Sequence, residues 1–100
     1  MVKFEWDNNK NIINIKKHKI SFEDAIYVFA DKNALIMKDE EHSDYEERFI
    51  TMGNIKGKFI AVVIHTDRTK NSNEEIIRII SARYATKNEI NEYYNRSDYE

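Results

Sequence analysis

Apolar residues recur every three or four positions in the first third of this chain and every second position later on. The first spacing is typical of amphipathic helices, and the second is typical of strands in a sheet. The pattern predicts helices over residues 8–18, 21–29 and 86–94. Strands are expected at residues 3–6, 34–37, 48–52, 58–66 and 76–81. The order β-α-α-β-β-β-β-α predicts an α+β domain, an antiparallel β-sheet meander with the helices packed on one face.

Residues that commonly cap helix N-termini precede the predicted helices. Asp7 stands before the first helix. Ser21 and Asp24 resemble a capping box at the second, and Thr86 and Glu89 form a capping box at the third. The first helix carries Ile12 and Ile15 on one stripe, with Ile13 beside it. Such a stripe is the usual apolar face of an amphipathic helix.

Length and composition favour a single globular domain over residues 1–100, with residues 95–100 as a frayed polar tail. Hydrophobic residues make up 41% of the chain, which argues against global disorder. Cysteine is absent, so disulfides and thiolate metal sites are excluded. The N-terminus shows no signal peptide, and the longest apolar run, residues 59–64, is far shorter than a membrane span. We therefore expect a cytoplasmic protein without a membrane segment.

Charge is segregated along the chain although the net charge is only −2. Residues 10–19 hold four lysines and a histidine with no acid, whereas residues 39–47 hold six acids with no lysine or arginine. The small net charge argues mildly against nonspecific nucleic-acid binding. Local fields therefore matter more than the total charge.

Arg78 raises a question because it interrupts an otherwise almost wholly apolar strand. Side chains alternate between the two faces of a strand, so Ile77 and Ile79 would face the helices and Arg78 the other side. An isolated guanidinium in a dry core would cost several kcal/mol. Arg78 must therefore reach water, a carboxylate or a bound anion on an open face of the sheet.

The same open face could collect Arg48, His65 and Arg83, which lie at strand ends. Residues opposite each other on neighbouring strands are about 5 Å apart, so these cations could form a phosphate-binding surface. The alternative is that Arg78 and Arg83 form surface ion pairs, for which the candidates are Glu46, Glu47 and Asp67. Guanidinium groups on opposite sides of the molecule, or each held by its own acidic neighbour, would rule out this shared phosphate surface.

Other catalytic motifs are absent from the sequence. The histidines at positions 18, 42 and 65 do not form a zinc motif, and the acidic stretch lacks the glycine of an EF-hand loop. There is no glycine-rich phosphate loop and no nucleophile elbow. If the protein is an enzyme, we expect it to work without a metal or an organic cofactor.

Three blocks of sequence, taken together, carry a family resemblance. They are FEWDNNKNIINIKKHKISFEDA, EHSDYEERFITMG and RIISARYATKNEINEYY. In this order and spacing they resemble the BrnT family of ribonuclease toxins, small type II toxin–antitoxin components with a RelE-like fold. The resemblance spans residues 3–94. Two departures are Lys19, which stands where the family usually has glycine, and a final helix that is less basic than usual. The turn at Lys19 is therefore expected to be made differently.

The resemblance implies a metal-independent endoribonuclease that cleaves RNA and blocks translation. It also implies neutralisation by a BrnA-type antitoxin, with promoter DNA bound only indirectly through that antitoxin. The family's functional positions fall on Lys17 as a substrate-binding residue and on His18, Arg48, Arg78 and Arg83 as catalytic residues. Among these, His18 is the candidate acid or base, because an imidazole exchanges protons near neutral pH.

Two other function classes compete with the nuclease. The first is a non-catalytic protein-binding module that uses the open sheet face, which fits the acidic net charge and the isolated arginines. The second is a DNA-binding regulator, which is disfavoured because no helix-turn-helix with basic recognition positions is visible.

Overall fold

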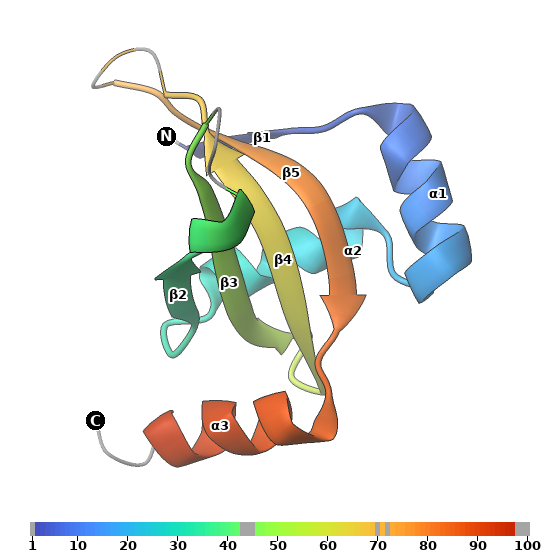
Figure 1. Ribbon diagram of the computed structural model, residues 1–100, viewed down its shortest axis with the longest axis vertical. Helices are drawn as coiled ribbons and strands as arrows, with labels where there is room; N and C mark the ends of the chain where they lie inside the picture. Colours follow the sequence, from blue (N-terminus) through green and yellow to red (C-terminus); the bar gives the residue numbers. More distant parts are fainter. Residues whose placement is uncertain (1, 43–45, 70, 72, 98–100) are drawn as a thin grey trace.

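The computed structural model describes residues 2–42, 46–69, 71 and 73–97, and it contains one five-stranded sheet (Figure 1). The strands are β1 (Val2–Glu5), β2 (Leu35–Lys38), β3 (Arg48–Ile55), β4 (Phe59–Asp67) and β5 (Glu75–Tyr84). The helices are α1 (Asn8–His18), α2 (Phe22–Ala25) and α3 (Lys87–Ser97), with short 3₁₀ helices η1 (Ile26–Ala30) and η2 (Glu40–His42). None of the described helices has the length and apolar character needed to cross a membrane.

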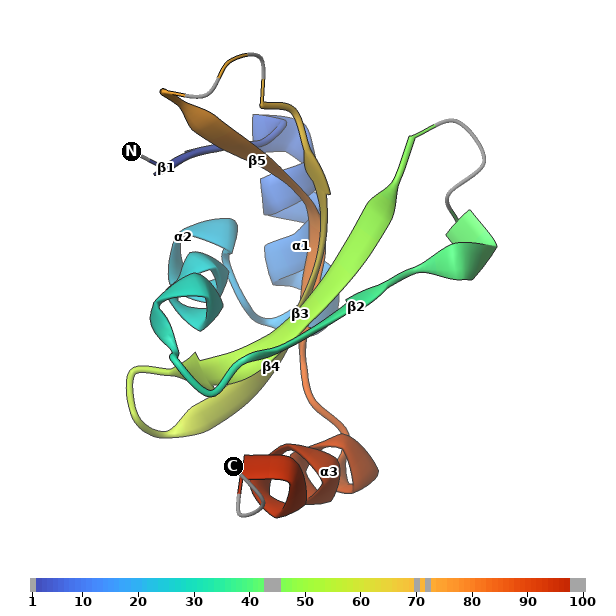
Figure 2. The same cartoon turned by 90° about the vertical axis from the view of Figure 1, so that its left-hand side faces the viewer.

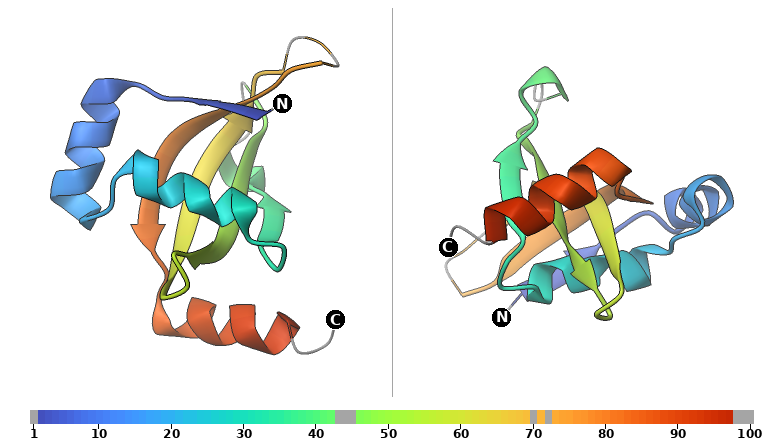
Figure 3. Two further views of the ribbon diagram at one scale, coloured as in Figure 1. Left: turned by 180° about the vertical axis from the view of Figure 1, so that it is seen from behind. Right: turned by 90° about the horizontal axis from the view of Figure 1, so that it is seen from below.

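The sheet has the order β1-β5-β4-β3-β2, and it is mixed rather than purely antiparallel. Strands β2 to β5 form the predicted antiparallel meander, but β1 pairs with β5 in parallel. The helices α1 and α2 with η1 carry the chain from β1 at one edge to β2 at the other (Figures 1 and 3). Because the pairing of β1 depends on this crossing, the local pattern of four residues could not predict it. The RelE-like classification stays a prediction.

The helices cover both faces of the sheet, so the expectation of helices on one face is wrong. On the first face, α2 and η1 bury Phe22 and Val28 against the strands. On the second face, α3 crosses the lower end of the sheet (Figures 2 and 3). Tyr93 of this helix is buried in one cluster with Met52 and Val62. The strands β3 and β4 are apolar on both faces at this end, which is why a second cover is needed there.

Gly53 lies inside β3, whereas the sequence pattern predicted that this strand would end at residue 52 and be followed by a turn. A Cβ atom at this position would lie 3.0 Å from the carbonyl oxygen of Val28 and 3.2 Å from its Cα. The missing side chain therefore lets η1 pack closely on the sheet. The turn itself follows β3, and Lys56 and Gly57 adopt positive φ angles there.

The α1 helix buries a polar face and exposes its apolar stripe. Its buried residues are Asn11 and Asn14, whereas Ile12, Ile13 and Ile15 are exposed. The amide nitrogen of Asn14 donates to the carbonyl oxygen of Ala82 at 2.9 Å, and its oxygen accepts from the Ala82 N–H at 3.1 Å. The side chain thus takes the place of a neighbouring strand along the edge of β5 beyond β1.

The expected helix caps are present. Asp7 accepts hydrogen bonds from two N–H groups at the start of α1, and Ser21 accepts one from Asp24. The expected second helix is only one α-helical turn that continues as η1. The last helix runs to Ser97, past the expected end, and residues 98–100 lie outside the described part of the chain.

Candidate functional site

A bulge in β5 determines where its two arginines lie. Arg78 pairs with Thr66 and Arg83 pairs with Val62, while a register shift leaves Ile80 unpaired between them. Residues an odd number of positions apart lie on opposite faces of a regular strand, and a bulge reverses this relation. Arg78 and Arg83 therefore share the second face, although a strict alternation would have separated them.

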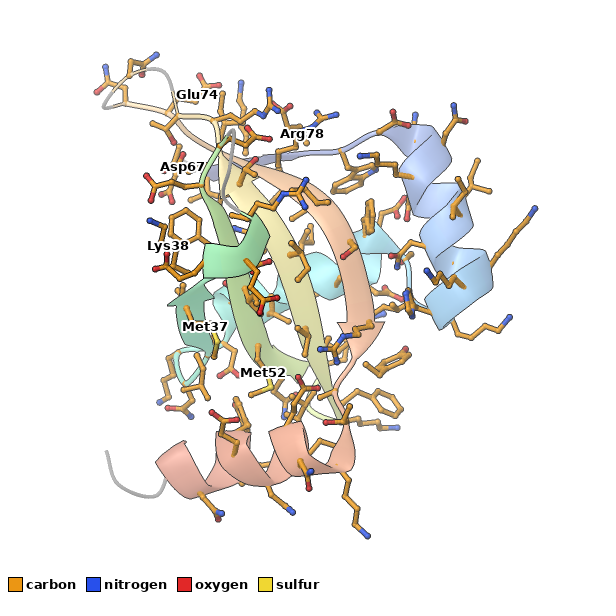
Figure 4. The ribbon with its side chains drawn as sticks, in the orientation of Figure 1. Met37, Lys38, Met52, Asp67, Glu74 and Arg78 are labelled. Atoms are coloured by element: carbon orange, nitrogen blue, oxygen red, sulfur yellow. The ribbon has the colours of Figure 1, made fainter. Side chains whose placement is uncertain are left out.

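The upper end of this face carries a row of polar residues across four strands. Glu5, Arg78, Thr66 and Arg48 stand opposite one another in adjacent strands. Arg78 donates to the carboxylate of Glu5 at 2.7 Å and lies where β1 joins the sheet (Figure 4). Thr66 is buried between Arg48 and Arg78, and its hydroxyl has no hydrogen-bond partner among the described residues.

At the lower end of the face, an ion pair joins β5 to α3. The guanidinium of Arg83 donates two hydrogen bonds to the carboxylate of Glu89, at 2.7 and 3.0 Å. Glu89 also accepts from the Thr86 N–H at 2.8 Å, which completes the expected capping box. The hydrogen bonds from Arg83 hold the pKa of Glu89 at about 2, and those to Glu89 raise the pKa of Arg83.

Both arginines are therefore held by an acidic neighbour, as the ion-pair alternative anticipated. Their partners are Glu5 and Glu89. The carboxylates proposed from the sequence have other contacts, namely Glu46 with Arg68, Glu47 with Lys38 and Asp67 with Thr69.

The two arginines also stand at opposite ends of β5. Met52, which lies opposite Val62 and so marks the Arg83 end, is far from Arg78 in Figure 4. Five residues of extended strand span roughly 15 Å. Arg78 and Arg83 cannot bind the same phosphate, so the expectation that they meet within one cross-strand spacing is wrong.

His65 lies on the first face and not with the arginines. Its ring is buried between Phe29 and Phe49, and its Nε2 is 2.7 Å from the hydroxyl oxygen of Thr51. Burial lowers the pKa of His65 to about 4. The prediction that it joins a cationic surface is wrong, because its position in β4 directs it into the core.

His18 and Arg83 come from elements that meet at the lower end of the sheet. The helix α1 runs in the same direction as β5, to which Asn14 anchors it at Ala82 (Figure 1). His18 is one helical turn beyond Asn14, and the next residue, Lys19, lines the same cavity as Tyr84. The half-buried His18 and the exposed Lys17 are thus carried to the Arg83 end, whereas Arg48 and Arg78 form the upper row.

Lys19 adopts a backbone conformation that glycine usually occupies. Its φ and ψ are 65° and 23°, in the left-handed region, and its N–H donates to the Ile15 carbonyl. The expectation of a different turn is wrong, since the helix ends in the geometry that a glycine would adopt and a lysine accepts the steric cost.

Sequence reasoning missed the carboxylates that hold the arginines. Glu89 was visible as a capping residue, but its second role depends on the approach of α3 to β5. Glu5 gave no signal, because the parallel pairing of β1 was not predictable. Across residues 2–42, 46–69, 71 and 73–97, no group of three or more histidine or acidic side chains could hold a metal ion.

Comparisons with known proteins show the family to which the chain belongs and a similar structure. The family described as "Ribonuclease toxin, BrnT, of type II toxin-antitoxin system" matches residues 6–89. The structure is similar to the 1.1 Å crystal structure of the Brucella abortus ribonuclease toxin BrnT, with a TM-score of 0.65 and 27% sequence identity. The similarity covers 87% of this chain and 100% of the Brucella chain. No curated protein matches the sequence.

Proposed function

Since this chain belongs to the BrnT family of ribonuclease toxins of type II toxin–antitoxin systems, we propose that it cleaves RNA at the lower end of the sheet, where α1, which carries His18, docks on β5 next to Arg83. The observation that carries the proposal is the docking of α1 on β5 through Asn14 and Ala82. This contact fixes the helix that carries Lys17 and His18 beside the strand that carries Arg83, 65 residues further along the chain than His18.

The proposed reaction uses the 2′-hydroxyl of the RNA as the nucleophile. Its oxygen attacks the adjacent phosphorus and loses its proton, the bond from phosphorus to the 5′ oxygen breaks, and that oxygen gains a proton. The products are a 2′,3′-cyclic phosphate and a 5′-hydroxyl, and the reaction needs neither a metal nor a cofactor. His18 either accepts the first proton or supplies the second, because an imidazole can do both near neutral pH.

Arg83 can bind the reacting phosphate while it remains paired with Glu89. A guanidinium has five N–H donors; Glu89 accepts from two of them, and the carbonyl oxygen of Tyr84 accepts from a third. The remaining donors can stabilise the charge that grows on the phosphate oxygens. Because the Arg83 side chain is 40% exposed, a phosphate in solution can approach it. The ion pair with Glu89 thus orients the guanidinium and leaves part of it available to the substrate.

The upper row is proposed to bind a different part of the RNA backbone. Arg48 and Arg78 lie too far from Arg83 along the strands to share its phosphate. They are suited to phosphates that flank the cleaved bond, where a planar guanidinium matches the phosphate oxygens. Lys17, an exposed residue next to His18, would contribute a further cation to the substrate.

The toxin is further proposed to act in the cytoplasm, where cleavage of RNA inhibits translation. We expect its neutralising partner to be a BrnA-type antitoxin. Promoter DNA would then be bound by the antitoxin and reach this chain only through it.

One observation favours the competing function of a non-catalytic protein-binding module. Both Arg78 and Arg83 have carboxylate partners, as arginines with a purely structural role do. A module of this kind would bind its partner through the second face and leave RNA intact. Direct measurement of RNA cleavage separates the two functions.

The decisive experiment incubates the purified chain with a defined single-stranded RNA in the presence of EDTA and maps the fragment ends. We expect cleavage to persist and to leave 2′,3′-cyclic phosphate and 5′-hydroxyl ends. Intact RNA would favour the binding module. Cleavage that stops on chelation would contradict the metal-independent mechanism.

Substitutions test the roles proposed for the individual arginines. Arg83→Gln should lower the cleavage rate roughly 10²–10³-fold, as loss of an oxyanion-binding donor does, and Arg78→Gln should mainly weaken RNA binding. Arg68→Gln is the matched control, since Arg68 is an exposed arginine paired with Glu46. If Arg78→Ala and Arg83→Ala both still arrest growth at matched expression, the assignment is wrong.

The role of His18 can be read from an RNA in which sulfur replaces the 5′ leaving oxygen. A thiolate leaves without protonation, so this substrate should restore most of the rate of His18→Ala if His18 is the acid. If His18 is the base, the variant should remain slow on both substrates.

A further inference from the structure

A surface cavity adjoins the lower end of the sheet and is assigned no role by the proposed chemistry. It has a volume of about 510 Å³, within the range of small-ligand sites. Lys19, Lys58, Phe59 and Tyr84 line it, above an apolar floor that includes Ala85 and Ile90. We call it the aromatic pocket.

Two aromatic rings stand in the aromatic pocket with much of their surface in water. Phe59 is 53% exposed and Tyr84 is 40% exposed. Their ring centroids are 5.6 Å apart, and the ring planes are inclined by 59°. The first residue of β4 and the last residue of β5 hold these rings, so their positions are set by the sheet. Exposed aromatic faces on a rigid support can stack with a flat ligand.

Among the described residues, the charged side chains that line the pocket are those of Lys19 and Lys58, and no described carboxylate lines it. The ammonium group of Lys19 donates to the carbonyl of Lys16 at 3.0 Å, which still leaves it two further donors. A ligand that combines a flat ring with negative charge suits this lining.

The aromatic pocket borders the proposed cleavage site along three segments of the chain. Tyr84 follows Arg83, Lys19 follows His18, and Ile90 follows Glu89. The guanidinium of Arg83 also lies 3.4 Å from the carbonyl oxygen of Tyr84. Although the side chains of Arg83 and Tyr84 point to opposite faces of β5, this contact places the guanidinium at the end of the strand, where a nucleotide next to the bound phosphate would reach the pocket.

We propose that the aromatic pocket binds the base of an RNA nucleotide adjacent to the cleaved phosphodiester, an inference that rests on the proposed function. The base stacks on Phe59 and Tyr84, while Lys19 and Lys58 contact the backbone phosphates. An acidic peptide fits less well, because carboxylate side chains offer no flat ring to stack on the exposed faces of Phe59 and Tyr84.

The test measures binding of a fluorescein-labelled 2′-O-methyl oligoribonucleotide by anisotropy. The 2′-O-methyl group removes the nucleophile, so the probe is bound and not cleaved. Phe59→Leu and Tyr84→Leu should each weaken binding roughly 5- to 150-fold, the range measured for loss of one stacked base. Tyr84→Phe should retain the affinity. Tyr27→Leu is the matched control, since Tyr27 is 52% exposed beside Lys56 but lies outside the pocket.

A series of probes with one abasic nucleotide separates base stacking from phosphate contacts. One abasic position should weaken binding to the wild-type chain, and the same position should have no further effect in Phe59→Leu with Tyr84→Leu combined. Equal losses in both proteins would overturn the inference, because the base would then be bound elsewhere.

Lys19→Gly makes stability and binding change in opposite directions. Glycine relieves the left-handed conformation, so Tm should rise by roughly 4–8 °C. Loss of a phosphate contact should weaken the probe and lower the slope of its log–log salt dependence by about 0.7. A variant that is more stable and binds as tightly as the wild type would contradict the role of Lys19.

The proposed function and the pocket can fail separately. If the wild-type chain neither cleaves RNA nor binds the probe, the proposed function fails. If it cleaves RNA while Phe59→Leu and Tyr84→Leu bind the probe as tightly as the wild type, the pocket inference alone is overturned.

Discussion

At the scale of single residues, polar side chains in this protein are fixed by partners from distant elements. Arg83 is held by Glu89 of α3, and His65 by Thr51 of the neighbouring strand. The proton affinities of Glu89 and His65 both differ from their ordinary values, for different reasons. The hydrogen bonds from Arg83 keep Glu89 ionised, and burial keeps His65 neutral.

His65 should make stability depend on pH. Its pKa is about 4 in the folded chain and 6.5 as the reference value, so the unfolded chain binds an extra proton between these pH values. The contribution is fully present above pH 6.5 and is lost as the pH falls toward 4. The difference in pKa corresponds to about 3 kcal/mol at most. Urea denaturation at pH 7 and pH 4.5 measures the loss.

His65→Gln supplies the comparison for this prediction. Glutamine can still form a hydrogen bond to Thr51 but does not titrate. The free energy of unfolding of the variant should therefore fall less over the same pH interval. Identical pH dependence in both proteins would show that His65 does not contribute.

At the scale of elements, α1 is positioned by hydrogen bonds and not by its apolar stripe. Beyond β1, the edge of β5 needs partners for its backbone groups, and a buried group without one is costly. Asn14 satisfies both polar groups of Ala82 and the carbonyl of Ile20. Asn11 similarly accepts from the N–H of Phe22. Because asparagine supplies both a donor and an acceptor, it meets this need and isoleucine does not.

Two substitutions on α1 should therefore have unequal effects. Asn14→Leu leaves three backbone groups without partners and should cost about 2–5 kcal/mol of unfolding free energy. Ile13→Gln alters a side chain that is 62% exposed and should change stability by less than about 0.5 kcal/mol. Urea titrations of both variants check this. A larger loss for Ile13→Gln would mean that α1 packs through its isoleucines.

At the scale of the whole molecule, α3 joins the two faces of the sheet. Tyr93 is buried in the second core, and its hydroxyl donates to Asp31, which follows η1. Burial would raise the pKa of Asp31, but the hydrogen bonds from Tyr93, Asn54 and Asn33 lower it. The end of η1 and the last helix are thus tied together across the edge of the sheet.

Tyr93→Phe tests this tie. Loss of a hydrogen bond to a charged group should cost about 1.5–3 kcal/mol. Thermal unfolding measures the loss, and faster hydrogen exchange in α3 would locate it. Tyr94→Phe is the control, because Tyr94 is 49% exposed. Equal effects of the two variants would contradict the proposed tie.

The sequence by itself determined the features that depend on neighbours along the chain. The caps at Asp7, Ser21 and Thr86 are correct because each hydrogen bond joins residues two or three positions apart. The four-stranded meander is correct because alternation and short turns specify it locally. The resemblance to ribonuclease toxins is likewise a property of the residues in order, and the family match bears it out.

Only the tertiary structure decided how these features combine. The parallel pairing of β1, the bulge that places Arg78 and Arg83 on one face, and the burial of Asn14 all depend on segments far apart in sequence. The partners of the two arginines were decided in the same way. A local pattern records which residues prefer burial, whereas packing determines which backbone groups and charges need partners, and here that second requirement prevailed.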